Sequence, residues 1–349
     1  MSTRPFLGAR AEEFARTRIN RRLETASWRP TVIPYVGYGT SDHIRVLARV
    51  VLTPRDARSQ LGQAAEGFLQ QRGWRNFLSA PVPRAEVTVQ MKGSRMQVRA
   101  DRGGYVDMRL TIEGLEPGVH EAEVITGDGQ VSKVPVQVVS SEETFGLVSD
   151  LDDTVISTSL PRLFIAAWNS FVVTEEGRRA VPGMARMYQQ MLAEHPGAPV
   201  IYVSTGSWNT HAFLNRFLTR HGFPKGAMLL TDWGPTHTGW FRSGPDHKRL
   251  SLRELARDFP NIRWVLVGDD GQHDPGLYAE FAELQPDRVR AIAIRELSMT
   301  EQVLAHGSTT VLSDDDHLAW RPQRAPEVRG RDGDELWPKL QAVLAQNPD

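Results

Sequence analysis

The sequence predicts an α/β protein in which a small antiparallel β-sandwich precedes a mostly parallel sheet with helices on both faces. Short strand-like segments separated by turns fill residues 31–143, and from residue 144 onward short apolar runs alternate with longer helical stretches. The length of 349 residues favours two domains, each large enough to bury a core. We therefore predict an N-terminal basic amphipathic helix within 1–30, a β-sandwich-like domain at 31–143, and an α/β domain with a C-terminal tail at 144–349.

The N-terminal segment is basic and has helical periodicity. Residues 1–85 hold 14 Lys/Arg and 6 Asp/Glu, a net charge of +8, whereas the rest of the chain sums to −9. Within residues 11–23, apolar side chains recur at helical spacing with arginines around them. Such helices lie on anionic membrane surfaces or, more commonly, pack on their own domain with a solvated basic face, and we favour the second interpretation.

The sandwich-like region contains short strands separated by glycine turns. Turn residues such as Lys92-Gly93-Ser94 and Arg102-Gly103-Gly104 separate the apolar segments, a spacing typical of an antiparallel sandwich. Residues 61–78 interrupt the pattern with a helical stretch or an insertion. The predicted strands are 44–52, 86–91, 105–112 and 131–139.

The following region alternates strands and helices, which predicts a mostly parallel sheet. Ligands of such sheets bind beyond the carboxyl ends of the strands, so the polar residues that follow each apolar run are the candidates for chemistry. The predicted strands are 145–149, 200–203, 227–230, 264–267 and 289–294. The predicted helices are 184–194, 210–221, 248–259 and 276–284.

Three carboxylates follow the first of these runs, at Asp150-Leu151-Asp152-Asp153-Thr154. Such crowding is unfavourable unless a cation neutralises it, and oxygen ligands without cysteine favour Mg²⁺. A carboxylate at Asp150 can attack phosphorus. Asp152, which points the same way out of an extended segment, can protonate a leaving oxygen and then activate water. A solvated acidic turn or a calcium loop is the alternative interpretation.

Polar residues also follow later strands. Ser204, Thr205 and Gly206 offer hydrogen-bond donors for a phosphate, although a helix-capping turn has the same composition. Lys248, at the start of a later helix, would balance the charge of carboxylates and substrate. The fourth run ends in Gly268-Asp269-Asp270-Gly271-Gln272-His273-Asp274, a second acidic cluster or a calcium-like turn. Adjacent strand tips would bring both acidic clusters to a common cation.

Taken in this order, the motifs resemble the four-motif signature of the haloacid dehalogenase superfamily of phosphohydrolases. The resemblance covers residues 150–274 and implies a Rossmann-like sheet. Only 47 residues lie between Val155 and Val203, which leaves room for little or no cap domain.

The resemblance also implies a role for each motif residue. Asp150 would be the nucleophile and a Mg²⁺ ligand, and Asp152 the general acid and base, with its backbone carbonyl on the metal. Thr154 would steady the loop. The substrate-binding residues would be Ser204, Thr205, Gly206 and Lys248, and the metal shell would be completed by Asp269 with either Asp270 or Asp274 assisting.

A narrower resemblance is to the catalytic domain of the actin-patch phosphatidate phosphatase family. It rests on the residues around Asp150 and on Tyr202-Val203-Ser204 with Trp208, together with the run from Val265 to Pro275. Tyr35-Val36-Gly37-Tyr38-Gly39-Thr40 and the sandwich-like region resemble bacterial members of that group. Gly206 and Ser207 depart from the Ser-x-Ser-Pro-Trp pattern of the family. The resemblance implies Mg²⁺-dependent removal of phosphate from phosphatidate to give diacylglycerol.

Composition limits the alternatives. A formal net charge of −1 argues against a general nucleic-acid binder, and the absence of cysteine suits a reducing compartment and excludes thiolate sites. No apolar run is long enough to span a membrane, so we expect a cytoplasmic protein that acts on a phosphorylated substrate, with peripheral membrane contact left open. A phosphatase for soluble or polymer-linked phosphomonoesters, or a non-catalytic lipid- or phosphate-binding protein, remains an alternative.

Aromatic residues near the expected site raise the question of a lipid surface. Such side chains favour the boundary between water and lipid, although burial in a core is their commoner position. The residues concerned are Phe164, Trp168, Phe171, Trp208, Trp233, Trp240 and Phe241.

Overall fold

The computed structural model describes residues 28–54, 81–157, 178–231, 244–271, 273–299, 301–302 and 324–346. The helix predicted within 11–23 and the interruption at 61–78 lie outside the described residues. The chain divides into two compact units, and the first boundary lies between Ser141 and Glu142. Residues 207–214 group with the N-terminal unit, which a division by sequence position alone does not anticipate.

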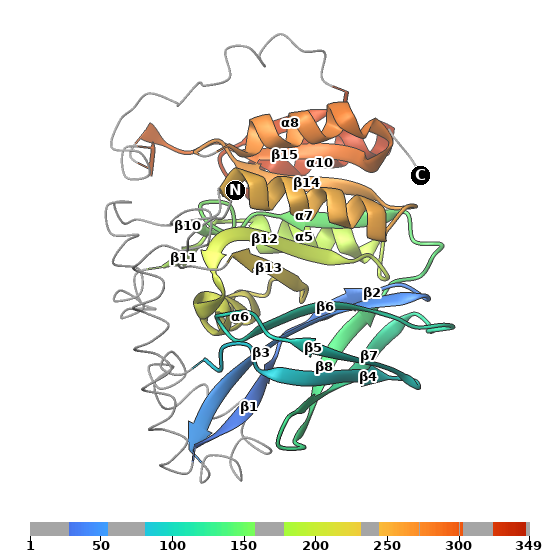
Figure 1. Cartoon of the computed structure of the whole chain (residues 1–349). Helices are drawn as coiled ribbons and strands as arrows, with labels where there is room; N and C mark the ends of the chain where they lie inside the picture. The colour runs from blue at the N-terminus through green and yellow to red at the C-terminus, as the bar shows by residue number, and fades with distance from the viewer. Residues whose placement is uncertain are drawn as a thin grey trace, which may run out of the picture. The chain divides into compact units, whose positions relative to one another are not determined.

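The described N-terminal unit is an eight-stranded sheet in which seven strands follow the order β1-β3-β2-β8-β7-β4-β5 and β6 pairs with β3 (Figure 1). Neighbouring strands are antiparallel except for the parallel pair β2 and β8. The strands are β1 (Trp28–Pro34), β2 (Gly37–Gly39), β3 (His43–Pro54), β4 (Glu86–Met91), β5 (Ser94–Arg99), β6 (Tyr105–Thr111), β7 (Gly118–Thr126) and β8 (Val131–Val138).

All four strands predicted here are confirmed, and four more are present. Three of these four lack a clear alternating pattern, because β1 contains prolines at Pro30 and Pro34, β2 is three residues long and β5 is mostly exposed. The fourth, β7, alternates in its second half. All eight strands share one hydrogen-bonded network. The division into two sheets that defines a sandwich therefore stays a prediction.

Alternating burial builds the core of this unit. Along β8, Val134, Val136 and Val138 are buried while the residues between them are partly exposed, as expected when successive side chains point to opposite faces. They pack in one apolar cluster with residues such as Val46 of β3 and Val89 of β4. Burial of apolar surface on one side thus holds the unit together.

The C-terminal unit is built on a six-stranded sheet with the order β13-β12-β9-β14-β15-β16. β12, β9, β14, β15 and β16 run parallel. The strands are β9 (Phe145–Ser149), β12 (Val200–Ser207), β13 (Ala227–Thr231), β14 (Arg263–Asp269), β15 (Val289–Arg295) and β16 (Glu327–Gly330). The five predicted strands and the parallel sheet are confirmed, and β16 is additional.

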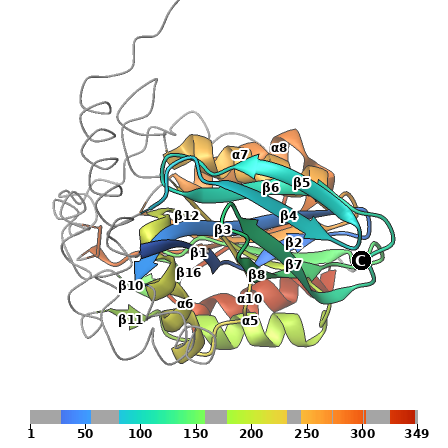
Figure 2. The same cartoon turned by 60° about the horizontal axis from the view of Figure 1, so that its bottom comes forward.

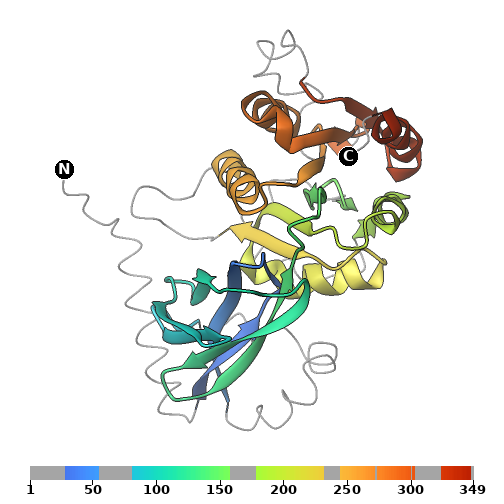
Figure 3. The same cartoon turned by 90° about the vertical axis from the view of Figure 1, so that its right-hand side faces the viewer.

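Helices cover both faces of this sheet. α7 and α8 lie on one face, and α5 and α10 on the other (Figure 2, Figure 3). The helices of the described chain are α5 (Met184–Ala193), α6 (His211–Arg220), α7 (Gly244–Asp258), α8 (Asp274–Leu284) and α10 (Gly333–Gln346), with short 3₁₀ turns η5 (Trp208–Thr210) and η6 (Pro286–Arg288). Because both faces are covered, β9 and β15 are buried along their whole length.

The strand order fixes where a ligand site can form. β9 comes first in this sheet, and its two neighbours are β12 on one side and β14 on the other. The connections that leave β9 and β14 therefore run in opposite directions, which opens a crevice at the carboxyl ends of these strands. Two short strands, β10 (Ile156–Ser157) and β11 (Arg179–Ala180), form a separate antiparallel pair, and β10 is the next strand after β9 in the chain.

None of the helices in the described part of the chain has the length and apolar character needed to cross a membrane.

Candidate active site

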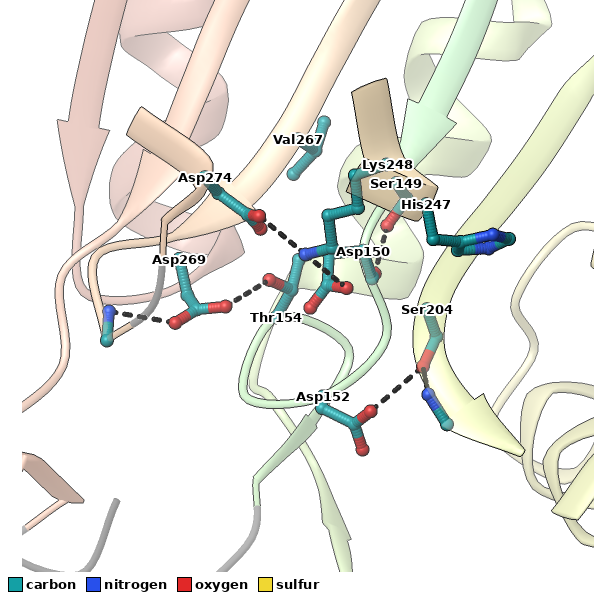
Figure 4. Close-up of polar contacts among 12 residues, drawn as sticks. Ser149, Asp150, Asp152, Thr154, Ser204, His247, Lys248, Val267, Asp269 and Asp274 are labelled. Atoms are coloured by element: carbon teal, nitrogen blue, oxygen red, sulfur yellow. Dashed lines mark hydrogen bonds and ion pairs between the residues drawn. The ribbon is translucent and has the colours of Figure 1, made fainter. Parts of the chain in front are cut away.

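Three buried carboxylates meet at the carboxyl ends of β9 and β14. Asp150 follows β9, Asp269 ends β14 and Asp274 begins α8. Each offers an oxygen, and these oxygens all lie within 4.8 Å of one another. The three side chains are almost completely buried (Figure 4). The sequence expectation that the two acidic motifs converge on one point is thus met by these three residues.

Local hydrogen bonds hold the cluster in place. The backbone N–H of Asp150 donates to the carbonyl of Val267 at 2.9 Å, which extends the pairing of β9 with β14. The carboxylate of Asp269 accepts from the backbone N–H of Gly271 at 2.8 Å and from the Thr154 hydroxyl at 3.3 Å. Thr154 therefore connects the loop after β9 to the tip of β14.

Gly268 makes room for the carboxylate of Asp274. A Cβ added to Gly268 would lie 2.5 Å from Oδ2 of Asp274 and 2.8 Å from the ring of Tyr278. We expect Gly268→Ala to lower the free energy of unfolding by roughly 1–3 kcal/mol, the usual cost of overpacking a core, and to weaken metal binding. Chemical denaturation and Mg²⁺ titration measure both effects.

Gly127→Ala is the matched control, because a Cβ there meets only one backbone oxygen at 3.9 Å. Equal losses of stability in the two variants would contradict a specific steric role for Gly268.

Lys248 enters the same cluster from α7. Its ammonium lies 2.9 Å from Oδ1 of Asp150 and 2.5 Å from Oδ1 of Asp274. Burial by itself lowers the pKa of Lys248, but the charges of Asp150, Asp274 and Asp269 outweigh burial and raise it. Lys248 is therefore a permanent cation in the site.

The three carboxylates and the lysine leave an unbalanced negative charge. With all four groups ionised, three negative charges face one positive charge. Burial, with the charges of Asp274 and Asp152, raises the pKa of Asp150 to about 8 despite the opposing effect of Lys248. Burial and the charges of Asp274 and Asp150 also raise the pKa of Asp269 well above its usual range. Protons or a divalent cation must complete the charge balance.

The donor set fits a hard divalent cation. Within the described part of the chain, Oδ2 of Asp150 and Oδ2 of Asp274 are buried without a hydrogen-bond partner. Unpaired buried carboxylate oxygens are costly, and a cation bound between them removes that cost. Oxygen ligands alone favour Mg²⁺ or Ca²⁺, and a small number of carboxylates favours Mg²⁺ because that ion retains several waters.

Asp152 lies apart from the carboxylate cluster. Its carboxylate accepts a hydrogen bond from the Ser204 hydroxyl of β12 at 2.9 Å, and the same hydroxyl oxygen accepts from the backbone N–H of Gly206 at 2.9 Å (Figure 4). The prediction listed Asp152 as a metal residue through its backbone carbonyl. Its side chain is directed to Ser204, one of the predicted substrate-binding residues.

Asp270 is the predicted metal residue that lies outside the carboxylate cluster. The carboxylate of Asp270 accepts a hydrogen bond from the backbone N–H of Leu297 at 2.8 Å, so Asp274, and not Asp270, stands with Asp150 and Asp269. The reason is geometric, because Asp270 turns toward the loop after β15 whereas Asp274 opens a helix beside the cluster. Thr205 packs beside Gly244, whose added Cβ would lie 2.7 Å from the Thr205 methyl group.

Of the seven aromatic residues considered for a lipid surface, the structure describes Trp208. Trp208 is buried in the N-terminal unit and stacks on Tyr35, with ring centroids 5.1 Å apart. The commoner expectation, burial in a core, is thus the correct one for Trp208. The other six aromatic residues considered for a lipid surface lie outside the described residues.

Sequence reasoning missed Arg295, a buried arginine at the end of β15. Its side chain donates to the backbone carbonyl of Asp153, in the loop between β9 and β10, at 2.7 Å. An arginine directly after the apolar run 289–294 was the available signal, since a charge at the tip of a central parallel strand needs a partner.

The C-terminal unit is similar to known proteins. The family described as "Phosphatidate phosphatase APP1, catalytic domain" matches residues 145–296. The chain is 28% identical over 153 residues to phosphatidate phosphatase APP1 of Saccharomyces cerevisiae, covering 43% of this chain and 25% of that protein. It is 26% identical over 168 residues to an uncharacterized protein of Schizosaccharomyces pombe, covering 48% and 27%. The chain thus spans about a quarter of the length of these curated relatives.

Among solved structures, the chain is similar to the HAD domain of the effector protein Lem4 from Legionella pneumophila. The TM-score is 0.30 and the identity 12%, covering 44% of this chain and 85% of that one. The residues matched by the family include Asp150, Asp152, Lys248, Asp269 and Asp274. Residues 145–296 of this chain are thus similar to the phosphatidate phosphatase APP1 catalytic domain.

Proposed function

We propose that this chain is a Mg²⁺-dependent phosphatase that works through a phosphoaspartate and removes phosphate from phosphatidate or a related lipid phosphate. The observation that carries the proposal is the cluster of Asp150, Asp269, Asp274 and Lys248 at the strand tips, beside the hydrogen-bonded pair of Asp152 and Ser204. This arrangement supports the proposal because it would give a bound phosphoryl group a nucleophile, a nearby proton donor and cation ligands.

In the first step, a carboxylate oxygen of Asp150 attacks the phosphorus of the monoester. The bond between phosphorus and the ester oxygen breaks, and the leaving oxygen takes the proton of the Asp152 carboxyl group. The products of this step are the free alcohol and an acyl phosphate on Asp150. Lys248, already 2.9 Å from Asp150, offsets the negative charge that gathers there.

In the second step, Asp152 acts as the base. It takes a proton from a water molecule, whose oxygen attacks the phosphorus, and the bond to Asp150 breaks. Inorganic phosphate leaves, Asp150 is again a carboxylate and Asp152 is again protonated. Ser204 keeps Asp152 in place through its 2.9 Å hydrogen bond and lies where the phosphoryl group would bind.

Asp150, Asp269 and Asp274 would hold the Mg²⁺, with the backbone carbonyl of Asp152 as the family resemblance implies. A bound Mg²⁺ supplies positive charge to the phosphoryl oxygens and brings the buried cluster to neutrality.

The lipid substrate is supported by the family match and by the name of the yeast relative. The short connection between β9 and β12 is the second support, because it leaves little chain for a covering domain and an open site suits a head group at a membrane surface. A lipid substrate would bring the protein into peripheral contact with membranes.

The test is phosphate release from phosphatidate vesicles and from a panel of soluble phosphomonoesters, each with Mg²⁺ and with chelator. We expect Mg²⁺-dependent release that is fastest with phosphatidate. Faster release from a soluble monoester would overturn the lipid assignment. Binding of phosphatidate vesicles without release of phosphate from any substrate would indicate a non-catalytic binding protein.

Asp152→Asn is expected to separate proton transfer from metal binding. Because the Asp152 side chain lies with Ser204 and not in the carboxylate cluster, Mg²⁺ affinity should change little. Turnover should fall by roughly 10² to 10⁴, the usual contribution of general acid–base catalysis. Isothermal titration with Mg²⁺ and steady-state phosphate release measure the two quantities, and full turnover in the variant would reject the role.

A further inference from the structure

The loop between β9 and β10, residues 150–155, contains an unfavourable backbone conformation that neighbouring contacts must stabilise. Asp153, between Asp152 and Thr154, has φ of 59°, in the left-handed region that side chains other than glycine rarely adopt. This conformation lets the chain turn back on itself, and the backbone N–H of Asp153 donates to the carbonyl of Ile156 at 2.8 Å. The direction in which the Asp152 side chain points therefore depends on the backbone conformation of Asp153.

Arg295, the last residue of β15, stabilises this turn by hydrogen bonds. Its guanidinium donates three hydrogen bonds: to the carbonyl of Asp153 at 2.7 Å, to the carbonyl of Arg331 at 3.0 Å and to Glu301 at 2.6 Å. Its side chain is 7% exposed. The planar guanidinium with donors in fixed directions suits this task, and a lysine cannot reproduce the three bonds.

Glu301 orients the guanidinium and connects it to β10, the strand that follows the loop. The carboxylate accepts from the hydroxyl of Ser157, in β10, at 3.3 Å and from the backbone N–H of Ser298 at 2.9 Å. Burial acts to raise the pKa of Glu301, but the hydrogen bonds from Arg295 and Ser298 outweigh it and lower the pKa. Glu301 is thus a carboxylate that pairs with a buried arginine.

We infer that Arg295 and Glu301 form a positioning pair that fixes the left-handed turn at Asp153 and thereby aims the Asp152 carboxyl group at the leaving oxygen. The inference rests on the proposed phosphatase function. Neither residue touches the carboxylate cluster through a contact found in the described structure, so the pair acts on the turn that carries Asp152 and not on the three carboxylates that would hold the cation.

The experiment compares Arg295→Gln with the unchanged protein on two substrates. Phosphatidate has a poor leaving group that needs a proton, whereas p-nitrophenyl phosphate has a good one that does not. We expect kcat to fall by roughly 10- to 100-fold with phosphatidate, as for a misplaced catalytic group, and by less than about threefold with p-nitrophenyl phosphate. Equal losses with both substrates would overturn the inference.

Arg290→Gln is the matched control. Arg290 is also a buried arginine of β15, but it lies at the opposite end of the strand, over the ring of Phe145. Its loss is expected to lower stability without a dependence on the leaving group. A leaving-group dependence in Arg290→Gln as large as that in Arg295→Gln would contradict a specific role of the pair.

Two further variants keep the inference testable. In an Asp152→Asn background, Arg295→Gln should cause no additional loss with phosphatidate, because both changes remove the same proton transfer. Asp153→Gly should restore part of the turnover lost in Arg295→Gln, since glycine adopts positive φ without strain. If Arg295→Gln fails to fold, Glu301→Gln replaces it, with a smaller expected effect of the same kind.

The outcomes also separate this inference from the proposed function. An unchanged protein that releases phosphate, with Arg295 and Glu301 variants of equal activity on phosphatidate, overturns the positioning pair alone. An unchanged protein that releases no phosphate from either substrate overturns both.

Discussion

Replacing Asp150 with Asn is expected to lower phosphate release by about 10⁴-fold or more, because the variant lacks the nucleophile that every turnover requires. The same change removes one of three buried carboxylates that repel one another. Thermal unfolding without Mg²⁺ at pH above 8 should therefore occur at the same or a higher temperature than in the unchanged protein. Loss of activity together with retained stability distinguishes a chemical role from damage to the fold.

Asp287→Asn is the control for this change. Asp287 is exposed in η6, before the amino end of β15, away from the strand tips that carry the site. The control should keep full turnover. Phosphate release by Asp150→Asn at the rate of Asp287→Asn would contradict the phosphoaspartate mechanism.

Adding Mg²⁺ to metal-free protein is expected to raise the unfolding temperature, and the gain should increase with pH. At a concentration of 100 times Kd, a ligand specific for the folded state stabilises it by about 2.7 kcal/mol. For a domain of this size, that corresponds to roughly 5–10 °C. Calorimetry with Mg²⁺ and with chelator, between pH 6 and pH 9, measures the gain.

The increase of this stabilisation with pH follows from the raised pKa of Asp150. In the metal-free fold this pKa is about 8, against a usual 3.8, mainly because of burial. The folded state therefore holds a proton that the unfolded state has released, and stability is lost as the pH rises from about 4 through 8. Mg²⁺ binds the ionised carboxylate, so the metal competes with the proton and its effect is greatest where Asp150 is ionised.

Asp269→Asn and Asp270→Asn form a matched pair for the metal. They are neighbours in sequence, but only Asp269 belongs to the carboxylate cluster. Asp269→Asn should remove most of the gain from Mg²⁺, whereas Asp270→Asn should retain it. A gain that does not vary with pH, or one that survives in Asp269→Asn, would contradict the assignment of these ligands.

The local pattern was sufficient to predict much of the C-terminal unit. Strands β9 and β14 are mostly apolar runs, and the carboxylates of Asp150 and Asp269 stand at their carboxyl ends. Apolar runs and helical periodicity depend on near neighbours in the sequence, so they can be read without coordinates. The short β2 and the exposed β5 lack such a pattern, because long-range pairing and not local composition makes them strands.

The sequence by itself determined which residue types stand at the strand tips, and therefore the class of chemistry. Only the tertiary structure decided which of them meet. Asp274 lies with Asp150 and Asp269, whereas Asp270 points away from them. Asp152 contacts Ser204. Lys248 contacts Asp150 from a helix far along the chain. The physical reason is that side chains must lie within a few ångströms of one another to share a site. Strand order, helix packing and buried hydrogen bonds set the distances between them. Arg295 shows this most directly. Its hydrogen-bond partners Asp153 and Arg331 are distant in sequence, and Glu301 stands in a segment without a recognisable motif.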